Sequence, residues 1–547
     1  MDLIQNHPTR SALARAACCC ALFISIGAAL IGSAGLGHDE GWHATVTLAL
    51  IDPAANPPLS GYPSMPLMRD TYNGALKTYL LYIPFRLFGV GVATLRWTTL
   101  LLGAFALFFL VLLTTRLYGP SLGFVFGLLF AMDPALILAA CFDIGPQILM
   151  LLLKLAAFWL LAEWWLEPNK AWRLFAAGVL LGLGLWEKTH FLWLVCALPV
   201  SMLVIPWRRL RPRLTAVNGL SGSAGFLTGA SAFILFNLKY SMLTFTAPGN
   251  VGDPMLHLRR LSQAIMERHD LMTDALTGAG QYSTVAGVRP PEFTTHFTYG
   301  LGSCLAILLL VYFVKRGGIA SLRHVWFWLA LSLLIFMGAC LTPASVKSQH
   351  LYLLYPFPQF VLIALIAHGL KEFRTLALYR PRWTVPIFAA CVAAQFAVIW
   401  SFRADLQRNG GARDCFSGMP LAARWLEDYA LKHPRTQLLA DNGLIGMLSI
   451  YSQGRLNFKE LPPGSSSPAD SDKNLSELRE LLKCPDNVVL LHIPTDAYRE
   501  PMSSFEALQF LKIRLQPLLV MDYDGKPWLG AYRVVNASKA GAGRPAK

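Results

Sequence analysis

The sequence predicts a polytopic α-helical membrane protein of about 11 transmembrane helices, followed by a small soluble α/β domain. Of its 547 residues, 54% are hydrophobic and only 14% are charged, against roughly 25% charged residues in an average soluble protein. The mean hydropathy is +0.45. Apolar runs long enough to cross about 30 Å of hydrocarbon recur along the chain. These observations exclude a string of soluble domains and an intrinsically disordered chain.

Eleven apolar runs are the candidate spans. They lie at 14–37, 93–115, 121–140, 146–166, 172–186, 189–206, 215–237, 297–314, 322–342, 350–369 and 383–401. The fifth and sixth runs are separated only by Glu187, Lys188 and Thr189, so the count is uncertain by about one span. We find no internal repeat of the kind that transporters with inverted halves carry.

The distribution of basic residues predicts the orientation. Lys and Arg number 47 and Asp and Glu 32, a formal net charge of +15. Such an excess also occurs in nucleic-acid-binding proteins, but here the basic residues gather in alternate loops, for example in 208–213. Because Lys and Arg mark cytoplasmic loops, we expect a multi-pass protein of the bacterial inner membrane, with a cytoplasmic N-terminus, a periplasmic C-terminus and no nucleic-acid partner. A signal peptide over 10–37 is an alternative that leaves the later segments outside as well.

This topology divides the chain into a membrane domain, 1–402, and an external α/β domain, 403–547. The membrane domain contains two long external loops, 38–92 and 239–296. Within the second loop, apolar residues fall at helical spacing near 255–276. That pattern predicts an amphipathic helix, which lies either on the membrane surface or packed within the loop.

The external domain shows alternating helix and strand signals. The expected elements, in order, are a helix at 420–431, a strand at 436–440 ending in an Asp441-Asn442-Gly443 turn, a polar linker at 462–474, a helix at 475–483, a strand at 488–493 and a hairpin with strands at 518–523 and 529–535. Of the ten cysteines, Cys415 and Cys484 are the two that fall in this domain. An oxidising compartment permits a disulfide between them, although the sequence leaves the pairing open.

An acidic pair, Asp39 and Glu40, stands where the first span leaves the membrane, within the segment Gly37-His38-Asp39-Glu40-Gly41-Trp42-His43. Partly dehydrated surroundings raise the pKa of a carboxylate and suit it to act as a general base. The alternative is a solvated cap on the emerging loop.

Sparse ionisable residues lie at the external ends of other spans. They are Lys77, Asp143, Lys188, Lys347 and His350. Each one alone is compatible with an interfacial charge reaching for water. Together, a carboxylate and several cations beside the lipid indicate a site that binds a lipid phosphate and activates a nucleophile opposite it.

The ordered motifs resemble a known family. After the acidic pair come Tyr-x-Gly, Tyr-x-Leu, Phe-Gly and Leu-Arg-Trp between residues 72 and 97, then Asp143, Gly-Leu-Gly-Leu with Lys188-Thr189, and His350-x-Tyr-x-Leu with a following Pro. Over about residues 14–400 this order is similar to that of the GT-C glycosyltransferases, which include the protein O-mannosyltransferases and the lipid A aminoarabinose transferases (glycosyltransferase family 39-like).

The resemblance implies transfer of a sugar from a polyprenyl-phosphate donor to a hydroxyl of a protein, lipid or glycan acceptor on the outer face. The prenyl chain of the donor lies in the lipid bilayer. It implies that Asp39 is the catalytic base, that Glu40 completes the acidic pair, and that Asp143 orders the acceptor side. It further implies donor-phosphate contacts by the cations, which are Lys77, Lys188, Lys347 and His350. The Lys-Pro-Pro element of the aminoarabinose branch is absent near Lys77, which argues against that branch.

Three alternatives remain open at this stage. A divalent metal at Asp39 and Glu40 would need further carboxylates, and the sequence places no third one nearby. A transporter or flippase for lipid-linked glycans would also use cations and an apolar groove, and Lys154 is a candidate mid-membrane charge for it. A non-catalytic envelope assembly protein would instead act through residues 403–547.

Overall fold

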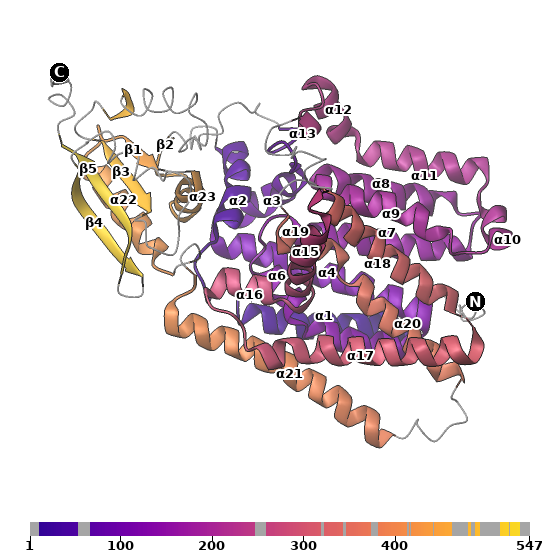
Figure 1. The fold of residues 1–547 in the computed structure, drawn as a ribbon. Helices are drawn as coiled ribbons and strands as arrows, with labels where there is room; N and C mark the ends of the chain where they lie inside the picture. Colours follow the sequence, from indigo (N-terminus) through magenta and orange to yellow (C-terminus); the bar gives the residue numbers. More distant parts are fainter. Residues whose placement is uncertain are drawn as a thin grey trace.

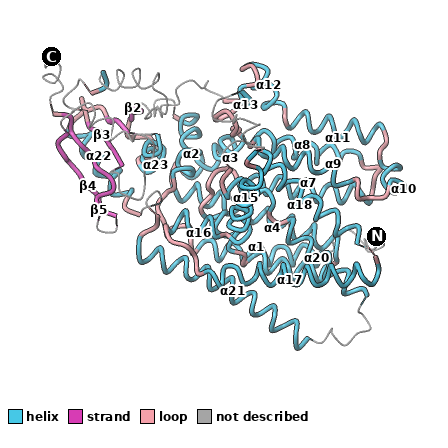
Figure 2. Tube along the Cα trace, viewed as in Figure 1, coloured by secondary structure: helices cyan, strands magenta, loops and turns pink. Residues whose placement is uncertain are grey.

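The computed structural model describes most of the chain. The described residues are 10–52, 66–246, 259–318, 322–342, 346–372, 381–412, 415, 417–440, 442–461, 480–482, 487–492, 515–523 and 526–535. A long bundle of helices occupies most of the molecule, and a small sheet with its own helices lies at one end (Figure 1). Figure 2 shows that the strands are confined to that end. Both the helical membrane part and the small C-terminal α/β part agree with the predicted fold class.

Seven helical segments in the described residues are long and apolar enough to cross a membrane. They are α1 (Arg10–Ala28), α4 (Val92–Tyr118), α7 (Gln147–Leu166), α17 (Glu292–Gly317), α18 (Arg323–Leu341), α19 with η5 and α20 (Ser348–Leu351, Tyr352–Leu354, Phe357–Glu372) and α21 (Pro381–Asn409).

Three bent pairs raise the number of spans to as many as ten in the described chain. They are α5 (Pro120–Ala131) with α6 (Pro134–Cys141), η2–α9 (Thr189–Met202) with α10–η3 (Trp207–Arg213), and α11 (Ala216–Gly229) with α12 (Ser231–Lys239), bent by 54°, 108° and 59°. The predicted fifth span corresponds to α8 (Ala171–Glu187), which has only 17 residues. Each of the eleven predicted runs therefore contains helix, although α1 ends at Ala28 within the first run and α8 is short for a span.

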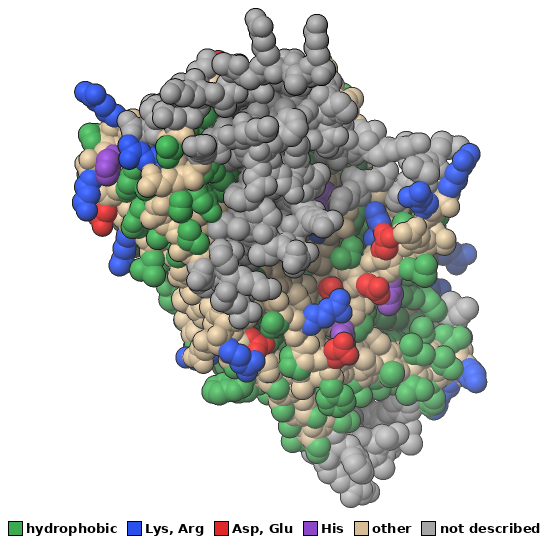
Figure 3. Space-filling model, turned by 60° about the vertical axis from the view of Figure 1, so that its left-hand side comes forward, with side chains coloured by type: hydrophobic (Ala, Val, Ile, Leu, Met, Phe, Trp, Pro, Cys, Tyr) green, Lys and Arg blue, Asp and Glu red, His purple; other side chains and the backbone are tan. Residues whose placement is uncertain are grey.

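The outer surface of the bundle is apolar, as lipid contact requires. Large hydrophobic side chains such as Phe105 on α4 and Leu308 on α17 are 58% and 68% exposed. On the face shown in Figure 3, hydrophobic side chains form broad patches, with charged side chains mostly between and around them.

Lys154 of α7 is a buried charge with a structural partner at the break between η5 and α20. Its Nζ donates to the carbonyl oxygens of Leu353 and Tyr355, at 2.7 and 2.5 Å. Pro356 follows this pair and lacks an N–H. The ammonium thus satisfies two carbonyls that the interrupted helix leaves without their usual partners.

Short helices cover the end of the bundle nearest the sheet. They are α2 (His38–Ile51), α3 (Leu76–Phe88), α13 (Leu243–Thr246), α15 (Leu261–Thr277) and α16 (Ala279–Ala286). The helix predicted near 255–276 is α15, and residues 255–258 lie outside the described residues. Its Arg268 donates to the carbonyl of Ala339 at the end of α18, at 3.1 Å, so α15 packs against the bundle.

The C-terminal domain is a five-stranded sheet with the order β2-β1-β3-β5-β4. Its elements are α22 (Met419–Lys432), β1 (Leu438–Ala440), α23 (Asn442–Tyr451), β2 (Phe458–Glu460), β3 (Val488–His492), β4 (Leu515–Tyr523) and β5 (Lys526–Val534). Strand β1 is parallel to β2 and β3, and β5 is antiparallel to β3 and β4. The predicted 420–431 helix, the strands and the hairpin are confirmed.

One local prediction for this domain is wrong. The turn expected after β1 is instead the start of helix α23, which begins at Asn442. The apolar residues that follow, including Leu444, Ile445 and Leu448, are buried, because they pack with α22 and the sheet in the core of the domain. Polar turn residues directly before an apolar run also serve as a helix start. Linker 462–474, most of the predicted 475–483 helix and Cys484 lie outside the described residues, so the disulfide stays a prediction.

Helix α23 joins the two domains by packing on α2. A Cβ on Gly446 would lie 3.0 Å from the Trp42 nitrogen, and one on Gly41 would lie 2.9 Å from the Met447 nitrogen. The Thr45 hydroxyl lies 3.3 Å from the Gly446 carbonyl. Because both helices present glycine at the crossing, their backbones come into direct contact.

Candidate active site

The first turn of α2 carries the predicted acidic pair, and its two carboxylates face different surroundings. Glu40 is 3% exposed and accepts a hydrogen bond from the Gly37 nitrogen at 3.0 Å. Asp39 is half-buried. Within the described residues it accepts one hydrogen bond, from Gln349 Nε2 at 3.4 Å.

Glu40 forms a buried ion pair with Arg96. The Arg96 Nε and Nη2 donate to the two carboxylate oxygens at 3.1 and 2.9 Å. The remaining guanidinium hydrogens bind the carbonyls of Ile31, Ala34 and Gly35. Arg96 therefore ties the end of the first span to α2, and Glu40 is fully engaged in that anchor.

Asp143 pairs with Lys77. Lys77 Nζ lies 2.9 Å from Asp143 Oδ2 and 3.1 Å from the Gly145 carbonyl. Both side chains are almost fully buried. Burial raises the pKa of Asp143, and Lys77 opposes that rise. Among the described residues, Asp143 Oδ1 has no hydrogen-bond partner, so this oxygen remains available.

Lys188 follows α8 and is 2% exposed. Its backbone forms an isolated antiparallel bridge with Asn73, in the loop before α3. Its surroundings have opposing effects: burial lowers the Lys188 pKa to about 8, while nearby Asp39 and Asp70 favour the charged form. Within the described part of the chain, no hydrogen bond or ion pair engages its ammonium.

Arg69 is the residue that sequence reasoning missed. It is 5% exposed, and among the described residues neither its Nε nor its Nη1 has a hydrogen-bond partner. Its Nη2 lies 3.6 Å from Asp70, and its guanidinium stands 5.0 Å from the Trp42 ring centroid. Burial lowers its pKa, and Asp70 and Asp39 raise it. In the sequence, Arg69 is a single arginine in a loop, and no local motif indicates that its side chain is buried beside Lys188.

Arg69 and Lys188 lie together because the loop before α3 folds onto the end of α8. The Arg69 nitrogen donates to the Asn73 carbonyl at 2.9 Å, and Asn73 is the bridge partner of Lys188. His43, one turn after Asp39 on α2, also faces this cluster. Burial lowers its pKa well below the ordinary value, as do the charges of Arg69, Lys77 and Lys188.

The side chains of Lys347 and His350, which the sequence groups together, have different surroundings in the structure. His350 is buried, and its ring stacks on that of His190, with centroids 4.2 Å apart. His190 also meets the Tyr72 ring edge to face. Lys347 is exposed, and its backbone nitrogen donates to His350 Nδ1 at 3.1 Å. His350 thus belongs to a group of stacked aromatic rings beside Lys188, whereas the Lys347 side chain is exposed to solvent.

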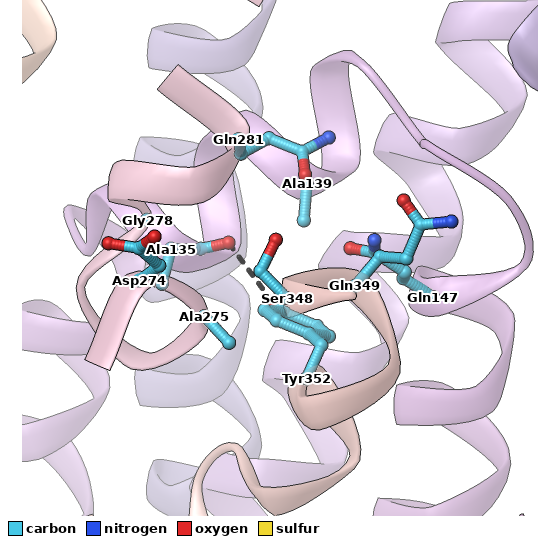
Figure 4. A pocket seen from close by; sticks show the side chains of 10 residues that line it. All are labelled: Ala135, Ala139, Gln147, Asp274, Ala275, Gly278, Gln281, Ser348, Gln349 and Tyr352. Carbon is cyan, nitrogen blue, oxygen red and sulfur yellow. Dashed lines mark hydrogen bonds between the residues drawn. The ribbon is translucent and has the colours of Figure 1, made fainter. Parts of the chain in front are cut away.

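A small polar pocket adjoins Asp39. It lies where α6, α15, α16 and α19 meet, and Gln349, the partner of Asp39, lines it (Figure 4). In the described residues, no group of three or more His, Cys, Asp or Glu side chains is arranged to hold a metal ion.

Comparison with known proteins identifies the architecture. The family model for dolichyl-phosphate-mannose-protein mannosyltransferases matches residues 74–236. The crystal structure of ArnT from Cupriavidus metallidurans bound to undecaprenyl phosphate matches with a TM-score of 0.57 at 12% identity, covering 94% of this chain and 97% of that one. The chain has the GT-C fold. The same ArnT in its apo state matches with a TM-score of 0.53 at 13% identity, covering 93% and 97%.

A search of curated protein sequences finds no significant match. The GT-C fold confirms the resemblance stated from the motifs. The family match begins at Gly74 and includes Lys77, Asp143 and Lys188, whereas Asp39, Arg69 and the C-terminal domain lie outside it. The roles of these residues must therefore be argued from their geometry.

Proposed function

We propose that this protein transfers a sugar from a polyprenyl-phosphate donor to an acceptor hydroxyl on the periplasmic face of the inner membrane. The observation that carries the proposal is the pair of buried cations, Arg69 and Lys188: among the described residues, Arg69 Nε and Nη1 have no hydrogen-bond partner, and no hydrogen bond or ion pair engages the Lys188 ammonium. Buried N–H groups that lack hydrogen bonds are costly unless a ligand accepts from them. The flat fork of donors of a guanidinium suits a phosphate.

The donor phosphate binds between Arg69 and Lys188, with Lys77 behind them. These cations stabilise the negative charge that develops on the departing polyprenyl phosphate, and such preorganised stabilisation is usually the largest catalytic contribution. Two further features support a lipid-linked donor: the GT-C fold shared with an ArnT crystallised with undecaprenyl phosphate, and the apolar bundle surface beside the site.

Asp39 acts as the general base. Its carboxylate is half-buried and is not consumed by an ion pair within 4.0 Å among the described residues, in contrast to Glu40 and Asp143. It takes the proton as the acceptor oxygen bonds to the anomeric carbon and the bond from that carbon to the phosphate oxygen breaks. A single displacement from the opposite face inverts the anomeric carbon.

The arrangement of charged loops supports the orientation. The basic helix α10 lies at the end of the bundle opposite the C-terminal sheet (Figure 1). If α10 is cytoplasmic, as the positive-inside rule requires, then Asp39, Arg69 and the C-terminal domain face the periplasm. A polyprenyl-phosphate donor suits that compartment because it needs no soluble nucleotide sugar.

The test uses membranes that contain wild type, Asp39→Asn or His38→Asn. His38 precedes Asp39 in the same helical turn and is exposed, so it is the matched control. Release of undecaprenyl phosphate from undecaprenyl-phosphate sugars reports turnover without knowledge of the acceptor. We expect Asp39→Asn to lose at least about a hundredfold in turnover while donor binding persists. Equal turnover in Asp39→Asn and wild type would refute the role of Asp39.

A flippase remains the alternative activity, but no specific observation favours it. Lys154, its mid-membrane candidate, is engaged with two backbone carbonyls. The assay also separates the two activities, since a flippase would move the donor without cleaving its phosphate–sugar bond.

A further inference from the structure

The pocket beside Asp39 offers hydrogen-bond acceptors from three different elements. Asp274 comes from α15, Gln281 from α16 and Gln147 from the start of α7. The Gln281 Nε2 donates to the Phe142 carbonyl, and the Gln147 Nε2 donates to the Ile144 carbonyl. One N–H of each amide is thereby engaged outside the pocket, and each amide oxygen is left as an acceptor for a ligand.

Figure 4 shows that the Gln281 carbonyl oxygen and the Ser348 hydroxyl point toward the middle of the pocket. Asp274 stands at its left side in that view. Among the described residues, no hydrogen bond or ion pair engages the Asp274 carboxylate. An acceptor-rich, negatively charged lining selects a group that donates hydrogen bonds and disfavours an anion.

The pocket is narrow, and its walls are rigid. It leaves room for about one water-sized group. A Cβ on Gly278 would lie 2.8 Å from the Ala135 nitrogen, and one on Gly280 would lie 2.7 Å from the Ser348 hydroxyl. The Tyr352 hydroxyl donates to the Ala135 carbonyl at 3.1 Å and fixes the ring on the floor. Close backbone packing of this kind resists widening.

We propose that this pocket, which we call the substituent pocket, holds one hydroxyl or amino substituent of the sugar being transferred. Asp274 and Gln281 accept its hydrogen bonds, while the walls exclude an acetamido group and the charge of Asp274 excludes a carboxylate. The pocket adjoins Asp39 through Gln349, so a sugar with its substituent seated here presents its ring to the base. This inference rests on the proposed function and names the class of sugar: one with a free hydroxyl or amino group at the seated position.

The experiment measures binding of the full-length protein in detergent to four probes. They are undecaprenyl phosphate alone and its neutral hexose, N-acetylhexosamine and uronic acid conjugates. We expect wild type to bind the hexose conjugate at least about tenfold more tightly than the N-acetyl and uronic acid conjugates. We expect Asp274→Ala to lose about tenfold in affinity for the hexose conjugate and to bind undecaprenyl phosphate as wild type does.

Asp270→Asn is the matched control, because Asp270 lies one turn earlier on α15 with an 88% exposed side chain. Ser348→Ala is the second variant should Asp274→Ala fail to fold, and we expect it to weaken hexose binding selectively. Selective loss in Asp274→Ala or Ser348→Ala supports the substituent pocket. An unchanged preference in both variants, or equal wild-type affinity for all three conjugates, overturns it. Failure of wild type to bind even undecaprenyl phosphate would instead count against the proposed function.

Discussion

Two buried arginines lie near the start of α2, and they differ in how many of their N–H groups have hydrogen-bond partners. Arg96 is 1% exposed and makes five hydrogen bonds, to Glu40 and to three backbone carbonyls. Arg69 is 5% exposed, yet its Nε and Nη1 have no partner among the described residues.

In the proposed function, this difference distinguishes an arginine that stabilises the fold from one that binds the donor. Burial of a charge is tolerated when hydrogen bonds replace the water that it loses, and Arg96 meets that condition within the chain. Among the described residues Arg69 does not, and in the proposed function the donor phosphate supplies the missing partners. Strained or unsatisfied groups of this kind concentrate at functional sites.

Arg96→Met tests the structural side and should have the largest effect. It leaves Glu40 buried without its counter-charge, which costs about 3–5 kcal/mol. We expect loss of folded protein, measured by thermal unfolding of the detergent-solubilised protein and by its yield from membranes. If Arg96→Met folds normally and loses only transfer, Arg96 does not have the structural role that distinguishes it from Arg69.

Arg69→Met tests the functional side. Removal of an unsatisfied buried charge should leave the unfolding temperature unchanged or raise it. Affinity for undecaprenyl phosphate should fall about a hundredfold, since charge-assisted hydrogen bonds contribute about 1.5–3 kcal/mol each. Titration with the labelled lipid measures this loss. Arg69→Lys should recover only part of the affinity, because an ammonium cannot replace the bidentate fork.

The contrast between the arginines also shows what the sequence alone can predict. The spans are predictable because each needs about twenty apolar residues, and their order brings Asp39, Asp143 and Lys188 to one end. The pairing of Glu40 with Arg96 is not, because 56 positions separate them and nothing local marks the contact. The position of Arg69 in the site cannot be predicted for the same reason, because its surroundings are created by the bridge between Asn73 and Lys188.

The same limit explains the missed helix α23. Its polar first residues are equally typical of a turn. Packing of the following apolar residues against α22 and the sheet decides for a helix, and propensity is a weak guide where tertiary contacts compete with it.

Gly446→Val tests whether turnover depends on the position of α2, the helix that carries Asp39. The new side chain meets the Trp42 backbone, where a Cβ already approaches to 3.0 Å. We expect destabilisation of about 1–3 kcal/mol and reduced turnover with nearly normal donor affinity, since Arg69 and Lys188 lie outside both α2 and α23. Thermal unfolding and the turnover assay measure the two effects. Gly300→Val on α17 is the control for the same replacement, because a Cβ at Gly300 would meet nothing within 4 Å.

The smallest expected effect concerns Lys188, which shares the site with Arg69. Its pKa is lowered to about 8 by burial, so the free protein holds the cation below about pH 8 and loses it above that value. A sugar-linked phosphate is a diester whose charge is constant over this range, and its negative charge favours protonated Lys188. Donor affinity should therefore be flat below about pH 8 and fall by up to about tenfold per pH unit above it. Lys188→Arg should remove this decline, because its guanidinium stays charged. A decline that persists in Lys188→Arg would assign the titration to another group and leave Arg69 as the principal phosphate contact.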